Sequence, residues 1–163
     1  MYIFLKLKHW QLFILWILGA IQLVLFMNTE FWFVGLGIYF GLFFGWVYSI
    51  GNVLNKTNVE ITKKLNVWSI LYLISIIPMG IHFHNMWSVA YQRIHPLLFI
   101  VSGIIGFFSI VNIGIIGAKS IQEKEKQNAL TFGNYAWEFF MILYMLIGVW
   151  FLQPRLNKLM SDK

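Results

Sequence analysis

Four long runs of uncharged, mostly apolar residues divide the chain, and they constrain its fold more than any other feature. The runs cover about residues 10–27, 31–50, 66–81 and 96–118. A helix rises 1.5 Å per residue, so the 23 residues of the last run would extend about 34 Å, enough to cross a hydrocarbon core of about 30 Å. The sequence therefore predicts four transmembrane helices.

The composition also indicates that lipid is the main solvent. Of the 163 residues, 60% are hydrophobic and 11% charged, whereas a soluble domain is about half apolar and a quarter charged. The first run is longer than the apolar part of a signal peptide, so we expect it to stay as a helix. The predicted fold is an all-α, polytopic integral membrane bundle that forms one membrane domain over residues 1–163.

The connections between the runs differ in length. The break at 28–30 is so short that the first two helices must form a tight antiparallel hairpin. We expect Pro78 and Gly80 to kink or stop the third helix. Longer polar connections are expected at 51–65, 82–95 and 119–134, the last with a solvated helix extension at 122–126.

A fifth apolar segment, 135–152, has two interpretations. Glu138 interrupts it and leaves 14 uncharged residues up to Leu152, a length at which re-entrant or interfacial segments compete with full spans. Trp137 and Trp150 near its ends are typical of the aromatic anchors of a span. Both alternatives stay open at this point.

The distribution of Lys and Arg predicts the orientation. Eight of the twelve lie in the N-terminal arm and in the 51–65 and 119–134 connections, and one, Arg93, lies in 82–95. Cytoplasmic loops are enriched in Lys and Arg, so the N-terminus is predicted to be cytoplasmic and the protein to be a multi-pass protein of the cytoplasmic (plasma) membrane. The three basic residues of the tail give a sharper asymmetry, 11 to 1, if the last segment turns back.

Small residues at four-residue spacing are candidates for close helix packing. Gly37, Gly41 and Gly45 fall near one face of the second helix, and Ser102 and Gly106 repeat the spacing in the fourth. In lipid, such residues let two backbones approach closely. The stripe therefore predicts either packing inside the bundle or an interface with a second copy or another membrane protein.

Three polar side chains inside apolar runs form a candidate intramembrane polar site: Glu138, Asn112 and Gln22. Ionisable groups in a membrane are costly and often functional, for example in a proton relay or a cation site. The alternative for the amides is a structural hydrogen bond between helices. Glu138 lies near the end of its segment, from which a flexible side chain can also reach the interface.

Three histidines, His82, His84 and His95, are weak candidates for a metal site. Zinc sites need about three converging ligands, but His82 and His84 are two residues apart and do not share a helix face. No carboxylate lies near them in sequence. We therefore predict no metal, and expect these histidines at the level of the lipid head groups.

Several classes of chemistry lack their sequence signals. The chain has no cysteine, which excludes disulfides and thiolate catalysis. It also has no phosphate-binding glycine loop, HExxH motif, nucleophile elbow or paired carboxylates. We expect no enzyme activity, no catalytic residues and no cofactor. The basic residues sit in short loops, so the expected partner is the lipid bilayer and not nucleic acid.

Both ends of the chain resemble a known family. Residues 5–13 read LKLKHWQLF, residues 138–140 read EFF, and residues 147–158 read IGVWFLQPRLNK, with looser agreement at 44–49. Together they resemble an uncharacterised family of small multi-span bacterial membrane proteins with no known activity. The resemblance implies a bacterial cytoplasmic membrane and draws attention to Glu138 and to Gln153 and Pro154.

Three functional hypotheses follow. The first is a non-enzymatic accessory or assembly subunit that acts through helix–helix contacts, based on the glycine stripe. The second is a small transporter or channel component that uses Glu138, Asn112 and Gln22. The third is a membrane metalloenzyme that uses the three histidines.

Overall fold

The computed structural model describes residues 3–26, 29, 31–55, 58–87, 96–126 and 131–161, with no side-chain description for 83–87, 96, 126 and 132. All elements in these residues are helices. They are α1 (Ile3–Lys6), α2 (His9–Phe26), α3 (Trp32–Leu54), α4 (Val59–Trp87), α5 (Pro96–Lys126), α6 (Phe132–Leu143) and α7 (Met145–Ser161). Helices α2, α3, α4 and α5 are long and apolar enough to cross a membrane. The all-α fold with four transmembrane helices is confirmed.

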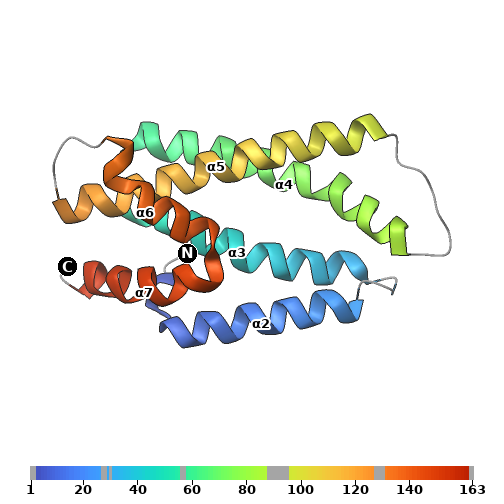
Figure 1. The fold of residues 1–163 in the computed structure, drawn as a ribbon, viewed down its shortest axis with the longest axis horizontal. Coiled ribbons are helices and arrows are strands. Elements are labelled where there is room, and N and C mark those ends of the chain that lie inside the picture. Colours follow the sequence, from blue (N-terminus) through green and yellow to red (C-terminus); the bar gives the residue numbers. More distant parts are fainter. Residues whose placement is uncertain are drawn as a thin grey trace.

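The four long helices lie roughly along one direction, with α2 beside α3 and α4 beside α5 (Figure 1). Glycines allow the helices of each pair to approach closely. A Cβ at Gly35 of α3 would lie 3.1 Å from the Cα of Leu23 in α2, and one at Gly106 of α5 would lie 2.7 Å from the Ser75 hydroxyl of α4. The predicted tight hairpin of the first two helices is confirmed.

Three of the long helices, α3, α4 and α5, are longer than the apolar runs that revealed them. Residues 51–54, 59–65 and 82–87, which were predicted as connections, are helical, whereas the helix extension predicted at 122–126 is present. An apolar run marks the part of a helix that lies in hydrocarbon, whereas backbone hydrogen bonding continues into water. Helix α5, for example, runs through the predicted solvated extension to Lys126.

Helix α4 begins in polar sequence, where side-chain contacts stabilise its first turns. Its first turn receives a side-chain cap, because Asn58 Oδ1 accepts a hydrogen bond of 3.1 Å from the Ile61 N–H. One turn later, Lys64 and Glu60 form an ion pair at 2.7 Å with the spacing that suits a helix surface. Pro78 does not stop the helix, which continues to Trp87, since membrane helices tolerate proline.

The fifth apolar segment reverses its direction. The helix breaks at Tyr144 into α6 and α7, which lie side by side at the end of the bundle that holds both chain termini (Figure 1). At the bend, a Cβ on Gly148 would collide with the carbonyl of Met141, so the close approach requires glycine. The segment is therefore a helical hairpin and not one continuous helix, as the turning-back alternative requires.

We expect Ser161 and Asn58 to lie on one side of the membrane and Thr29 on the other. The chain has no cysteine of its own, so single replacements Ser161→Cys, Asn58→Cys and Thr29→Cys report each position separately. An impermeant thiol reagent applied to intact cells should label Thr29→Cys alone, and lysis should expose the other two. Labelling of Ser161→Cys together with Thr29→Cys in intact cells would contradict the reversal of the last segment.

Candidate functional site

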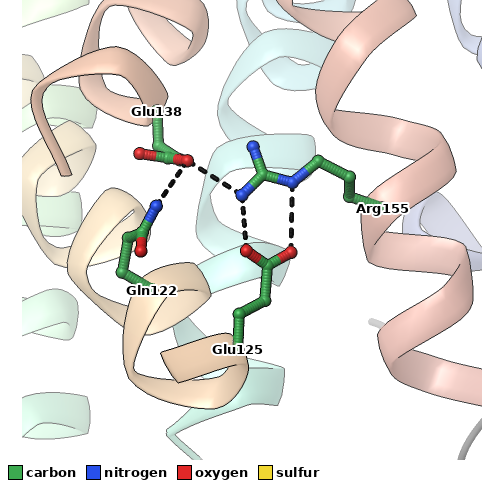
Figure 2. Close-up of polar contacts among 4 residues, drawn as sticks. All are labelled: Gln122, Glu125, Glu138 and Arg155. Carbon is green, nitrogen blue, oxygen red and sulfur yellow. Dashed lines mark hydrogen bonds and ion pairs between the residues drawn. The ribbon is translucent and has the colours of Figure 1, made fainter. Parts of the chain in front are cut away.

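The hairpin of α6 and α7 carries a buried acid. Glu138 lies in the second turn of α6, and its side chain is only 2% exposed. It points into the protein, between α5 and α7 (Figure 2). A carboxylate in such surroundings needs charged or hydrogen-bonding partners, since desolvation of an isolated charge is very costly.

Glu138 is held by partners from two other helices. Arg155 of α7 donates a hydrogen bond of 2.8 Å to Glu138 Oε1, and the amide of Gln122 in α5 donates one of 2.7 Å to the same oxygen (Figure 2). Arg155 also binds Glu125 of α5 through two nitrogens, at 3.0 and 2.5 Å. We call Gln122, Glu125, Glu138 and Arg155 the polar cluster; it joins α5, α6 and α7.

The polar cluster carries two carboxylates and one guanidinium. The hydrogen bond that Arg155 donates to Glu125 raises the pKa of Arg155 above its ordinary value despite partial burial, and the bond to Glu138 adds to this. Arg155 therefore stays charged, and it is the one cation that both carboxyl groups contact within the described residues. Glu138 Oε2 and Gln122 Oε1 are buried and accept no hydrogen bond within the described residues. The cluster thus has unused acceptor capacity.

A second polar anchor lies two residues before Arg155, at Gln153 of α7. Its fully buried side chain accepts a hydrogen bond of 2.9 Å from the Trp46 indole in α3. Its amide nitrogen donates to the carbonyls of Phe4 and Leu7, at 2.9 and 2.8 Å. Those carbonyls lie where α1 ends, at which a helix leaves carbonyls without intrahelical partners. Gln153 therefore ties the hairpin to both α3 and the N-terminal arm.

The three residues of the predicted polar site, Glu138, Asn112 and Gln22, do not come together in one site. Asn112 donates its amide to the carbonyl of Phe108 in its own helix, at 2.8 Å. Gln22 lies in the second half of α2, where its backbone faces Gly35 of α3. The hydrogen bonds of Glu138 go to other residues, Gln122 and Arg155. Of the three predicted residues, Glu138 is the one that belongs to the polar cluster.

The predicted packing residues are of two kinds: some already contact a neighbouring side chain, and others have space beside them. A Cβ at Gly45 would lie 2.6 Å from the Phe4 ring, and Gly106 packs against Ser75. Ser102 is buried on α5, and its hydroxyl donates to the Phe99 carbonyl at 2.9 Å. At Gly37 and Gly41, in contrast, nothing lies within 4 Å of an added Cβ.

One of the three histidines has a described side chain. His82 stacks on Phe99, with ring centroids 4.0 Å apart. The side chain of His84 and the whole of His95 lie outside the described residues. In the part that the structure describes, no group of three His, Cys, Asp or Glu residues could hold a metal ion.

Sequence reasoning missed Arg155, Gln122 and Glu125 as site residues. It treated Arg155 as an orientation charge and residues 122–126 as solvated. A signal existed, because a reversal at Tyr144 brings Arg155 of α7 back toward Glu138 of α6. That signal is readable only once the segment is known to turn back.

Comparisons with known proteins do not assign a role to the polar cluster. No protein-family model, no curated protein and no solved structure matches the chain.

We expect the polar cluster to stabilise the hairpin through charge neutralisation. Arg155→Met leaves Glu138 buried without its cation and should lower the free energy of unfolding by about 2–4 kcal/mol. Glu138→Gln removes the buried charge and keeps an acceptor oxygen, so it should have a small effect, and the double variant should recover most of the loss. Denaturant unfolding of the purified protein in detergent measures these changes.

The matched control is Lys64→Met, which breaks an ion pair that is exposed to solvent. Exposed pairs contribute little, so its stability should not change measurably. A double variant that is as unstable as Arg155→Met alone would show that Arg155 acts through packing and not through its charge.

Proposed function

We propose that this chain is a non-enzymatic membrane subunit that docks a transmembrane helix of another subunit on the open glycine face of α3, formed by Gly37 and Gly41. The observation that carries the proposal is the empty space over both glycines. They are one helical turn apart and exposed, so they form one continuous shallow strip. In lipid, helices associate where small residues let their backbones approach.

Other glycines of the bundle support this interpretation, because they differ from Gly37 and Gly41 in their surroundings. Cβ atoms at Gly19, Gly35 and Gly106 would meet neighbouring helices at 2.7–3.1 Å, so these glycines already serve contacts inside the bundle. At the open glycine face, in contrast, no neighbour lies within 4 Å of an added Cβ among the described residues. A second copy of the chain or another membrane protein would fill it.

The orientation that we propose places the polar cluster on the cytoplasmic side. Both chain termini lie at the same end of the bundle as the α6–α7 hairpin (Figure 1). The N-terminal arm and the tail together carry Lys6, Lys8, Arg155, Lys158 and Lys163, and basic residues favour the cytoplasmic side. The similarity of the chain ends to the small bacterial family supports a bacterial cytoplasmic membrane.

We expect Gly41→Ile to abolish association while the fold is retained. The added side chain has space within the monomer but would block a second helix from approaching. Affinity-tagged protein in mild detergent, examined by light scattering and by recovery of co-purifying subunits, reports the assembly. Recovery should fall at least tenfold.

The matched control is Gly103→Ile, because Gly103 of α5 also has nothing within 4 Å of an added Cβ but lies outside the stripe. Both variants change the same residue type in a spanning helix. Equal assembly of the two variants and the wild type, or a wild type that is monomeric and recovers no partner, would refute the proposal.

A second candidate function is a small transporter or channel component. The observation that favours it is the buried, unused Oε2 of Glu138 in a helical hairpin that enters the bundle from one end. Buried acids at membrane depth bind protons or cations in transport proteins. Asn112 and Gln22 do not contribute to this site, so the path that they would have formed is not part of this candidate.

For this candidate, protein reconstituted into vesicles should carry protons or monovalent cations, measured with a pH-sensitive or cation-sensitive dye. Glu138→Gln should reduce the flux more than tenfold, because the amide cannot take up the proton or balance the cation. Glu125→Gln, at the exposed edge of the same cluster, serves as the control and should keep most of the flux. Vesicles with the wild-type protein that leak no faster than empty ones would exclude this function.

A further inference from the structure

A cavity of about 430 Å³ lies at the tip of the hairpin, away from the polar cluster. Its walls come from α2, α3 and α4 and from the bend between α6 and α7. Much of the wall is aromatic: Trp16, Tyr39, Phe40, Phe43, Tyr72 and Tyr144. A second cavity of about 280 Å³ adjoins it and shares Phe40 and Tyr72.

The cavity lies about midway along the bundle and is partly open to the outside of the protein. Tyr72 is near the middle of α4 (Val59–Trp87), so it is roughly 20 Å along the helix from either end. The hydrocarbon core of a bilayer is about 30 Å thick, and the ester and head groups of phospholipids lie outside it. An occupant at this depth is therefore a lipophilic molecule or the apolar part of one.

The wall offers one buried hydrogen-bond donor that has no partner in the described residues, and further polar groups lie near it. The indole N–H of Trp16 is buried and has no hydrogen-bond partner within the described residues. An indole nitrogen can only donate. Met145 and Leu146 also line the cavity and are the first residues of α7, where a helix has N–H groups without intrahelical acceptors. Tyr39 and Tyr72 add two hydroxyl groups to the same wall.

We infer that this cavity binds a lipophilic ring with carbonyl oxygens, of the quinone class. Aromatic walls suit a ring: Trp16, Tyr39 and Tyr72 all line the cavity, and aromatic side chains pack favourably against flat rings. A carbonyl oxygen would accept a hydrogen bond from the indole N–H of Trp16. An acyl chain has no acceptor and would leave this buried donor unsatisfied, which is costly.

The test compares two probes of equal shape on the full chain in lipid nanodiscs. The first is 2,3-dimethyl-1,4-naphthoquinone, and the second is 2,3-dimethylnaphthalene, which lacks the oxygens. Bound probe is measured after rapid capture of the nanodiscs, with empty nanodiscs as the background for partitioning. The quinone should bind saturably and at least tenfold more tightly than its oxygen-free counterpart.

Variants of residues in the cavity wall test whether the quinone binds there. Tyr72→Phe and Trp16→Phe keep an aromatic ring in the wall and each remove a donor, so each should weaken quinone binding about five- to tenfold. Tyr48→Phe is the matched control, because Tyr48 bonds Asn66 outside the cavity, and it should leave binding unchanged. Thermal unfolding of each variant checks that it is folded.

Two outcomes would overturn the inference. Equal binding of both probes, unaffected by Tyr72→Phe, would show that the cavity holds an apolar chain. The absence of saturable quinone binding above empty nanodiscs would show that the cavity is not a quinone site.

Discussion

Lipid offers no hydrogen bonds, so every polar group at membrane depth must find its partner inside the protein. Burial inside the protein imposes a similar need on Glu138. One oxygen of its carboxylate, Oε1, accepts hydrogen bonds from Gln122 and from Arg155, and the second bond requires α7 to run back along α6. A straight helix through residues 135–152 would carry Arg155 far from Glu138. The buried acid and the reversal of the chain thus depend on each other.

The reversal has a consequence at its tip. A bend at membrane depth exposes backbone N–H groups and carbonyls, which is tolerated only where protein covers them or where they line a cavity. Here, α2, α3 and α4 surround the bend but do not fill the space next to it. The hairpin therefore produces two distinct environments. A charged, partly exposed cluster lies near its open end, and a mostly apolar cavity with the unpartnered indole N–H of Trp16 lies at its closed end.

Much of the fold could be predicted because its main determinant is local. A run of 18 or more uncharged residues identifies a spanning helix wherever the rest of the chain goes, and residues 10–27 and 96–118 behaved accordingly. Glu138 was identifiable for a similar reason, as the one acid inside an apolar run. Its partners were not, because pairing it with Gln122 and Arg155 depends on the bend at Tyr144. Helix ends were mispredicted because polar residues mark the membrane boundary and not the end of the helix.

The glycine stripe shows how tertiary structure separates residues that look equivalent in sequence. Gly37, Gly41 and Gly45 have the same spacing on the same face, yet Gly45 alone is covered, by the ring of Phe4. Phe4 is positioned there because Gln153 of α7 binds its carbonyl. The anchor that holds the hairpin against the bundle therefore also closes one end of the stripe. What remains open is the pair Gly37 and Gly41, which belongs to neither the polar cluster nor the anchor at Gln153, so a helix could dock there without replacing any of their contacts.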